Sequence, residues 1–422
     1  MRKLLFLLIV AAGARQGAAQ STNEYDAELA QGAVSVKSSF TAIGEWRGVF
    51  QTRPGLEVPF NFEIRDSRDG APELFFLNAG ESFDGGRVTR RGDSLFIAIN
   101  QFDNELALGI SGDSLSGVLR RQDGTGQALA LRATKDGSRR FDPRGIAPAK
   151  NISGTYAVSF LLANGQEEKS VGLFKQKGAK LEATFLHITG DSRYLEGVVE
   201  GDSFRLSSFI GSGPTYYRGR IGVDGTISGE IAGVRGNRLF RAVPDGHAAL
   251  PDAYTLTALK PGYSTLDFSF PDADGHPISL RDDRFRNKVV VVTIGGTWCP
   301  NCIDETAFLS PWYRANRDRG IEVVSIQYER QTDTEFVHKV LGRMRERYAI
   351  DYMQVIGGLA DKKAVASSLP ALNGFLAFPT TIFVDRQGKV AKIHTGFNGP
   401  ATGRYYQEFV KEFNDEVDLL LR

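Results

Sequence analysis

Two cysteines, Cys299 and Cys302, are the residues of this chain best suited to carry out chemistry. They are the only cysteines among 422 residues, and just Pro300 and Asn301 separate them. A disulfide between them would close a very small loop and would remove little entropy from the unfolded chain. A thiolate attacks a disulfide sulfur, and a second thiol nearby can then release the mixed disulfide. The spacing therefore favours a chemical role for the pair over a structural one.

A zinc site is the alternative for two cysteines at this spacing. Zinc in proteins prefers about four ligands. The chain offers no further cysteine, and its five histidines are scattered without a ligand-like spacing. We therefore expect neither a metal nor any other cofactor at this position.

The residues around the pair predict a strand, a turn and a helix. Residues 289–294 are a continuous apolar, β-branched run, which is typical of a buried parallel strand. Pro300 fits the first turn of the helix that follows, because its missing N–H costs nothing there. Unpaired amides and the helix dipole favour a thiolate over a thiol at a helix start. We predict that Cys299 is an exposed nucleophile and that Cys302, one turn further in, is the resolving thiol.

From about residue 264 to the end, predicted strands alternate with predicted helices, so this part is expected to be α/β. The final pair of strands forms a hairpin, which makes the sheet mixed. The last helix is amphipathic, with apolar positions spaced for one face. Further strands are expected at 321–326, 352–356, 381–384 and 390–394, further helices at 334–348 and 361–369, and the apolar face of the last helix at Tyr405, Phe409, Phe413, Val417 and Leu420.

Three segments of this part resemble the thioredoxin superfamily. The motif Trp298-Cys-Pro-Asn-Cys302 resembles its redox motif, and residues 267–280 look like the lead-in of its exported TlpA/ResA-type disulfide reductases. Phe378-Pro379-Thr380, just before a strand, looks like the cis-proline loop of the superfamily. The resemblance covers about residues 264–422 and implies a thioredoxin-like fold for them.

The resemblance also implies roles for individual residues. Cys299 would attack a disulfide, and Cys302 would resolve the intermediate. Pro379, in the cis form, would face the dithiol. The predicted substrate-binding residues are Trp298, Pro300, Phe378, Pro379 and Thr380.

Glu305 is predicted to accept the proton of Cys302. Thioredoxins have a buried aspartate six residues before the first cysteine, but this chain has Thr293 there. The TlpA/ResA branch has a glutamate three residues after the second cysteine, which is Glu305 here. A spacing of three places Glu305 on the same helix face as Cys302, and partial burial would raise its pKa. The chain departs from the branch two residues later, where it has Ala307 instead of proline.

Residues 43–247 read as short strands separated by glycine, aspartate, serine and asparagine turns. Three pairs of segments repeat at offsets of 110, 109 and 112 residues: those starting at 44 and 154, at 91 and 200, and at 116 and 228. The near-constant offset predicts two copies of one β unit, 43–148 and 149–247. Each copy is expected to be a small antiparallel sandwich or barrel. The whole protein is thus predicted to be multidomain.

The first residues have the pattern of a signal peptide, with Arg2 and Lys3 before an apolar run from 4 to 12. That run is well short of the roughly 18 residues that span a bilayer. We expect a signal peptide at 1–20 and linkers at 21–42 and 248–263. Export would place the protein in the periplasm, with peripheral or no membrane association.

Charge and resemblance together give the expected function. The chain has 51 Lys and Arg residues against 50 Asp and Glu residues, a balance that argues against nucleic acid as a partner. The resemblance implies an exported thiol-disulfide oxidoreductase that reduces protein disulfides. Its expected partners are a client protein with a disulfide and a membrane-bound electron donor.

Two alternatives remain open from the sequence. The first is a peroxiredoxin-like thiol peroxidase; such enzymes generally have threonine three residues before the reactive cysteine, where this chain has Gly296. The second is a binding protein whose β units hold a ligand and whose redox domain is accessory, because the β region is longer than the α/β region.

Overall fold

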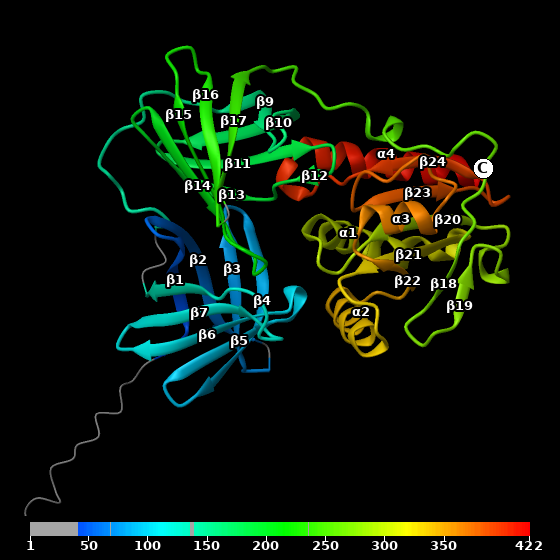
Figure 1. Cartoon of the computed structure of the whole chain (residues 1–422), viewed down its shortest axis with the longest axis horizontal. Helices are drawn as coiled ribbons and strands as arrows, with labels where there is room; N and C mark the ends of the chain where they lie inside the picture. Colours follow the sequence, from blue (N-terminus) through cyan, green and yellow to red (C-terminus); the bar gives the residue numbers. More distant parts are fainter. Residues whose placement is uncertain (1–40, 68, 136–138, 235) are drawn as a thin grey trace, which may run out of the picture. The chain divides into compact units, whose positions relative to one another are not determined.

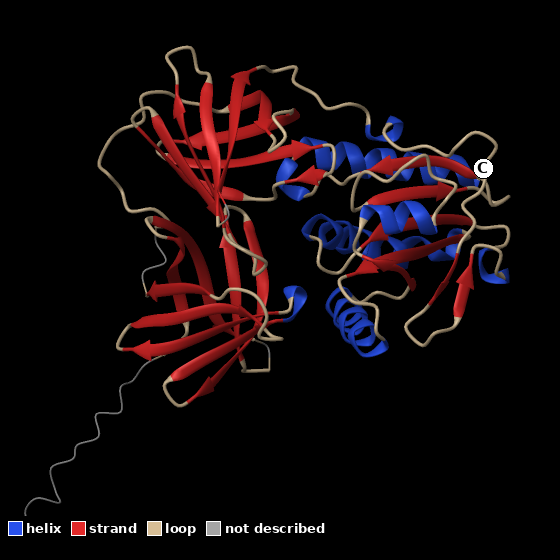
Figure 2. Ribbon diagram, in the orientation of Figure 1, coloured by secondary structure: helices blue, strands red, loops and turns tan. Residues whose placement is uncertain are grey.

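An all-β region comes first in the chain and an α/β region follows it (Figures 1 and 2). The computed structural model of the protein describes residues 41–67, 69–135, 139–234 and 236–422. Residues 42–422 cluster as one unit. The predicted signal peptide and most of the predicted linker 21–42 lie outside the described residues. No helix in the described ranges is both long and apolar enough to cross a membrane.

The first β unit is a closed barrel of eight strands, in which each strand pairs with the next and β8 pairs with β1. Apolar residues alternate along the strands because successive side chains point to opposite faces. In β2, for example, Val58, Phe60 and Phe62 are buried in the barrel core. The strands are β1 (Gly44–Arg53), β2 (Leu56–Asp66), β3 (Pro72–Asn78), β4 (Glu81–Arg91), β5 (Ser94–Ile99), β6 (Asn104–Ser111), β7 (Ser114–Arg121) and β8 (Leu129–Thr134), with a short helix η1 (Asn100–Phe102) after β5.

The second β unit closes in the same way. Its sheet runs from strand to strand with antiparallel pairing, and pairings of β10 with β11 and of β17 with β9 complete the ring. One short strand, β12, is added to β11 outside the ring. The strands are β9 (Gly154–Leu161), β10 (Glu167–Lys177), β11 (Lys180–His187), β12 (Gly190–Asp191), β13 (Leu195–Glu200), β14 (Ser203–Ser208), β15 (Thr215–Ile221), β16 (Ile227–Gly233) and β17 (Gly236–Pro244).

The repeated segments of the sequence fall at equivalent places in the two barrels. Gly44 and Gly154 both open the first strand of their barrel. Gly92 and Gly201 both occupy the turn before a strand, with φ of 59° and 58°, a conformation that glycine adopts at no steric cost. Both units are therefore barrels of one architecture, as the repeat predicted, and the sandwich alternative is excluded.

The second barrel supplies a core residue to the first. Phe209, which follows β14, is 1% exposed and meets the rings of Phe50, Phe60 and Phe76 edge-on, with centroids 4.7, 5.0 and 4.7 Å away. Asn78 at the end of β3 brackets its backbone: the side-chain amide donates to Phe209 O at 3.0 Å, and Phe209 N donates to Asn78 Oδ1 at 3.2 Å. The two barrels thus share an aromatic core at this point.

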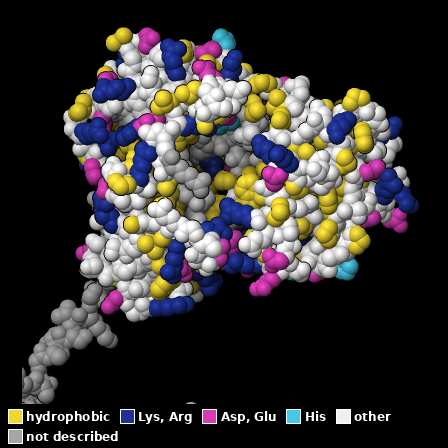
Figure 3. All heavy atoms as spheres, viewed as in Figure 1, with side chains coloured by type: hydrophobic (Ala, Val, Ile, Leu, Met, Phe, Trp, Pro, Cys, Tyr) yellow, Lys and Arg dark blue, Asp and Glu magenta, His cyan; other side chains and the backbone are white. Residues whose placement is uncertain are grey.

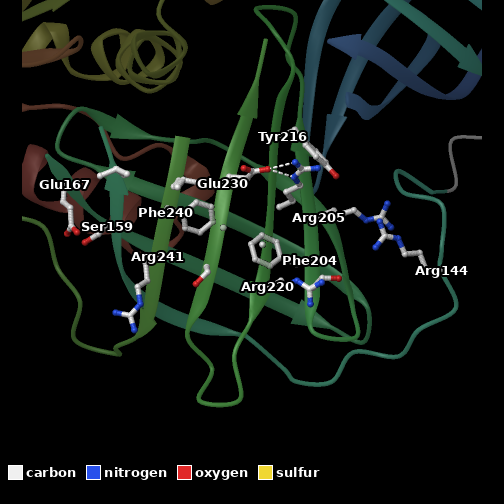
Figure 4. Close-up of a pocket in the computed structure, with 17 residues that line it drawn as sticks. Arg144, Ser159, Glu167, Phe204, Arg205, Tyr216, Arg220, Glu230, Phe240 and Arg241 are labelled. Carbon is white, nitrogen blue, oxygen red and sulfur yellow. Dashed lines mark hydrogen bonds and ion pairs between the residues drawn. The ribbon is translucent and has the colours of Figure 1, made fainter. Parts of the chain in front are cut away.

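The outer face of the second barrel is hollowed over β14 to β17, with a volume of about 690 Å³ (Figure 4). Figure 4 shows Phe204 and Phe240 among the strands, with arginines around them. These arginines are largely paired with carboxylates: Arg205 with Glu200 at 2.5 Å, Arg218 with Glu230 at 2.5 Å and Arg220 with Asp202 at 2.8 Å. On the face drawn in Figure 3, basic and acidic side chains are likewise interspersed.

The α/β region is built on a five-stranded sheet in the order β22-β21-β20-β23-β24. The strands β20, β21 and β22 are parallel, and β23 and β24 add antiparallel pairs, which is the mixed sheet expected. The elements are β18 (Ser269–Pro271), β19 (Pro277–Ser279), β20 (Val289–Gly295), α1 (Pro300–Asn316), β21 (Ile321–Glu329), α2 (Thr334–Tyr348), β22 (Met353–Leu359), α3 (Lys362–Ser368), β23 (Thr380–Val384), β24 (Val390–Thr395) and α4 (Arg404–Leu421), with short helices at Ala253–Thr255, Asp283–Phe285, Arg317–Arg319 and Pro400–Thr402.

Helices cover both faces of this sheet, so β20 is buried throughout. Val289 and Val291 pack with Leu309 of α1 and Phe413 of α4 on one face. The intervening residues of β20 face the other side, where Val365 of α3 contributes to the core. This is a thioredoxin-like fold, and it confirms the predicted fold class.

The segment predicted as a second linker, 248–263, packs on the α/β region. Tyr254 joins the core beside α4, and Leu259 makes a β-bridge with Leu372. Asp252 caps the short helix by accepting from Tyr254 N. These contacts hold residues 248–263 against the α/β region. The turn-forming residues of the segment had predicted only a linker.

We predict that Phe209→Ala destabilises the first barrel, although Phe209 belongs to the second. Loss of a buried phenylalanine should lower the free energy of unfolding by about 3–5 kcal/mol. The measurement is urea unfolding followed by the fluorescence of Trp46, in a chain whose other two tryptophans are replaced by Trp298→Phe and Trp312→Phe.

The control is Val223→Ala, because Val223 is 93% exposed. It should change the free energy by no more than about 0.5 kcal/mol. A Phe209→Ala transition that coincides with that of the control would contradict a shared core.

Candidate active site

The dithiol lies at the start of α1, directly after the buried strand β20. Cys299 is the N-cap of the helix, and its sulfur accepts a hydrogen bond from Cys302 N at 3.3 Å. Pro300 occupies the first turn, as predicted, where a missing N–H leaves no helical bond unmade. Both cysteines are free thiols. The backbone of the turn thus presents its amide to the sulfur of the first cysteine.

Cys302 is buried beneath Cys299 with 3% of its surface exposed. Burial raises the pKa of the Cys302 thiol well above its usual value, and Cys299 and Glu305 raise it further. Cys302 therefore stays protonated at neutral pH, and it needs a proton acceptor before it can attack.

Glu305, the predicted proton acceptor, lies one turn after Cys302 on α1. It is 5% exposed, and its Oε1 accepts from Thr381 Oγ1 at 2.6 Å. Burial raises the pKa of Glu305 to about 7, an effect that the Thr381 hydrogen bond partly opposes. The predicted direction of the pKa is thereby confirmed. Pro311 lies inside α1, yet the helix runs on to Asn316, and Glu305 is among its buried residues.

The loop before β23 faces the dithiol. The Phe378–Pro379 peptide bond is cis, as predicted. Cys299 Sγ lies 3.7 Å from the carbonyl oxygen of Phe378. The Phe378 ring packs edge-on against Trp298, with centroids 5.4 Å apart and planes at 77°. This loop and Trp298 together bound the space beside the first sulfur.

Trp298 folds back over the end of the sheet and donates from Nε1 to Tyr328 O at 2.8 Å. Only glycine fits at 296, because a Cβ there would lie 2.4 Å from Trp298 Nε1 and 2.7 Å from Tyr328 O. Gly296, at the position where peroxiredoxins generally have threonine, therefore has a steric role: it leaves room for the Trp298 side chain.

One prediction about exposure needs correction. Cys299 was expected to be exposed, but its side chain is only 5% exposed. The side chain of Thr380, a predicted substrate-binding residue, is fully buried and donates to Ala377 O at 2.8 Å, so only its backbone is left for such a contact. Pro379 is buried as well, whereas Trp298, Pro300 and Phe378 are partly exposed. The residues that surround the dithiol thus pack more closely than their spacing in the sequence could indicate.

Three polar residues of the site were missed by the sequence analysis. Thr381 bonds Glu305, as described above. Glu329, at the end of β21, accepts from Thr297 N at 2.8 Å and from Thr297 Oγ1 at 2.9 Å, and burial raises its pKa to about 7. Gln101 of the first barrel donates to Thr297 O at 2.7 Å. The sequence offered little signal for Glu329, because the same strand also contains the polar residues Glu322, Ser325 and Gln327.

One cluster of possible metal ligands occurs among the described residues, in the hairpin between β18 and β19. It consists of Asp272, Asp274 and His276, and two of the three are exposed. Asp272 Oδ1 accepts from the backbone N–H groups of Asp274 and His276, both at 2.9 Å. These hydrogen bonds stabilise the turn of the hairpin, so the three residues lie together for a structural reason.

Comparison with known proteins shows what the α/β region is similar to. The Redoxin family model matches residues 260–407. The thiol-disulfide oxidoreductase ResA of Halalkalibacterium halodurans is 25% identical over 158 residues, which cover 37% of this chain and 80% of that protein. ResA of Geobacillus thermodenitrificans is 28% identical over 141 residues, covering 33% and 72%.

Solved structures are similar over the same part. A thiol-disulfide oxidoreductase from Bacteroides fragilis covers 35% of this chain and 99% of its own, with 21% identity and a TM-score of 0.26. A thiol:disulfide interchange protein from Chlorobium tepidum covers 39% of this chain and 100% of its own, with 20% identity and a TM-score of 0.28.

The C-terminal region therefore has a thioredoxin-like fold and is similar in sequence to thiol-disulfide oxidoreductases of the ResA type. It follows a long β-rich region.

The raised pKa of Glu305 predicts a pH dependence of stability. The folded state holds this proton up to about pH 7, whereas an ordinary glutamate loses it near 4.5. The free energy of unfolding should therefore fall as pH rises from about 4.5 to 7, by up to about 1.4 kcal/mol per pH unit. Glu305→Gln should remove this part of the decline.

The measurement is the urea midpoint of both proteins at intervals between pH 4.5 and 8. The control is Glu335→Gln, an exposed carboxyl in the first turn of α2. The assignment fails if the wild type and Glu305→Gln decline in parallel.

Proposed function

We propose that this protein is an exported thiol-disulfide oxidoreductase that reduces disulfides of client proteins through Cys299 and Cys302. The observation that carries the proposal is the free dithiol at a helix N-terminus, with the sulfur of Cys299 accepting from Cys302 N and facing a cis-proline loop. The names of the similar ResA proteins support the class of activity. Export is proposed from the signal-like pattern at residues 1–20.

The proposed reaction has two exchange steps. Cys299 thiolate attacks one sulfur of the client disulfide, forms a mixed disulfide and expels the other client sulfur as a thiolate. Cys302 then transfers its proton to Glu305 and attacks Cys299 Sγ, which releases the second client thiolate. Two electrons pass to the client, and a Cys299–Cys302 disulfide remains. A membrane-bound electron donor would return the two electrons.

The site residues divide this work between them. The raised pKa keeps Cys302 protonated, so it cannot attack until its proton has been removed. Glu305 lies on the same helix face as Cys302 and has a pKa of about 7, so it can accept a proton and release it near neutral pH. Trp298 and Phe378, being partly exposed, are the proposed contacts to the client polypeptide.

Neither alternative function is favoured. A peroxidase would need the peroxide to reach Cys299, and Gly296 takes the place of the threonine typical of that class. For a ligand-binding role, the interior of the first barrel is already filled by aromatic side chains, including Phe209. Reduced protein that consumed hydrogen peroxide faster than it reduced insulin would restore the first alternative.

Reduction of insulin by the full chain tests the proposal directly. The wild type should precipitate insulin B chain in the presence of dithiothreitol, and Cys299→Ala should not. Cys302→Ala lacks the resolving thiol, so it should retain client proteins as mixed disulfides that are visible on non-reducing gels and released by dithiothreitol.

The double variant Cys299→Ala, Cys302→Ala is the matched control, because it keeps every surface except the sulfurs. Proteins retained by Cys302→Ala but not by this control are clients. A wild type with no activity above the double variant would end the proposal.

The role of Glu305 predicts a pH profile. The carboxylate must be ionised to accept the proton of Cys302, so release of the mixed disulfide should accelerate as pH rises through about 7. Glu305→Gln should slow this step by about 100-fold at neutral pH and should lose that inflection. Rapid mixing of the protein with a chromogenic disulfide between pH 5 and 9 measures the step.

Attack by Cys299 on the same reagent is the internal control, because Glu305 takes no part in it. Its rate should be similar in both proteins. An unchanged inflection near pH 7 in Glu305→Gln would remove Glu305 from the mechanism.

A further inference from the structure

The second barrel reaches the turn that carries the dithiol. Its short strand β12 brings Asp191 against Asn301, one of the two residues between the cysteines. In the amide orientation that satisfies both groups, Asn301 donates to Asp191 O at 3.2 Å and accepts from Asp191 N at 2.6 Å. Gly190 approaches so closely that a Cβ there would lie 2.0 Å from the terminal amide group of Asn301. The side chain of Asn301 is thus paired with barrel backbone.

The carboxylate of Asp191 ties the same strand to the loop after β24. Its Oδ2 accepts from Gly399 N at 2.6 Å, and its Oδ1 accepts from Arg193 N at 2.5 Å. Arg193 has a φ of 55°, a left-handed conformation that costs free energy in a residue other than glycine. The bonds of Asp191 hold the backbone in that conformation.

Arg193 holds the other residue between the cysteines. Its Nη1 donates to Pro300 O at 3.1 Å and pairs with Asp304 Oδ2 at 2.5 Å. Its Nη2 pairs with Glu81 Oε1 of the first barrel, also at 2.5 Å. The arginine side chain is 9% exposed. One guanidinium therefore joins both barrels to the first turns of α1.

The buried charges around Arg193 must compensate one another for this contact to be stable. Burial raises the pKa of Asp304 to about 7; Arg193 opposes the effect, and the carboxylates of Asp191 and Glu81 add to it. Glu81 and Asp304 thus share one guanidinium, and the Asp191 carboxylate lies near enough to raise the pKa of Asp304. Removing one partner of such a buried pair leaves the others uncompensated, unlike the loss of an exposed ion pair.

We propose that Asp191 and Arg193 are positioning residues of the dithiol, through which the second barrel sets the equilibrium between the dithiol and its disulfide. The inference rests on the proposed function. Both residues between the cysteines, Pro300 and Asn301, are held from outside the thioredoxin-like domain. Disulfide formation must bring the two sulfurs to about 2 Å from each other, which alters the turn that these contacts hold.

Reciprocity gives the direction of the effect. The contacts of Asp191 and Arg193 are made with both cysteines as free thiols. A contact that binds one redox form better than the other shifts the equilibrium toward that form by the same factor. The barrel therefore favours the dithiol, and loss of the contact favours the disulfide.

The test is the redox equilibrium of the full chain in glutathione buffers. Oxidation of the Cys299–Cys302 dithiol by one glutathione disulfide yields two glutathione molecules and the protein disulfide. Arg193→Lys keeps the charge but cannot reach three partners, and Asp191→Asn removes one carboxylate charge. Each should shift the equilibrium toward the protein disulfide by about fivefold or more, the lower end of typical couplings between sites.

The control is Arg241→Gln on the exposed outer face of the second barrel, which should leave the equilibrium within about twofold of the wild type. Thermal unfolding of both redox forms is measured alongside. By reciprocity, each variant should lower the melting temperature of the reduced form more than that of the oxidised form.

An equilibrium unchanged in both folded variants overturns the proposal, and so does an equal loss of stability in the two redox forms, which would mark a purely structural contact. If one variant fails to fold, the other decides. Failure of the proposed function is a separate result: it would be a wild type that equilibrates with glutathione but does not reduce insulin.

Discussion

The hydrogen bond from Cys302 N to the sulfur of Cys299 is the interaction on which the site depends. It exists because a helix begins at Pro300 directly after a buried strand, so that the amides of the first turn have no helical partner. β20 is covered on both faces, which leaves the start of α1 little freedom to move. The same burial places Cys302 and Glu305 away from water, and raises the pKa of both.

Position and hydrogen-bond partners therefore distinguish chemically similar groups. Cys299 lies at the helix end beside the Phe378 carbonyl, whereas Cys302 is one turn deeper next to a carboxyl. Glu329 gains a pKa of about 7 in the same way, but both of its oxygens accept from Thr297, which gives it a structural place under the motif. The hydrogen bonds that each acid makes, more than its residue type, therefore distinguish Glu305 from Glu329.

The two barrels are built as one body with the redox domain. Phe209 of the second barrel completes the core of the first, and Arg193 joins both barrels to α1. Closed barrels have no free strand edges, so their contacts with neighbours are made by the loops and short strands at their ends. The additional strand β12, which has no counterpart in the first barrel, provides the contact with the dithiol turn.

The sequence by itself determined the periodic features: the order of strands and helices, the duplicated β unit, the cysteine pair at a helix start and the glutamate one turn further along. These follow from local spacing, because side-chain direction repeats every two residues in a strand and every 3.6 in a helix. Only the tertiary structure decided that Cys299 is nearly buried, that Thr381 and Glu305 bond across 76 positions, and that Arg193 reaches Pro300. Such contacts join residues far apart in the chain, and they depend on how closed barrels and a covered sheet pack, a property that no local pattern encodes.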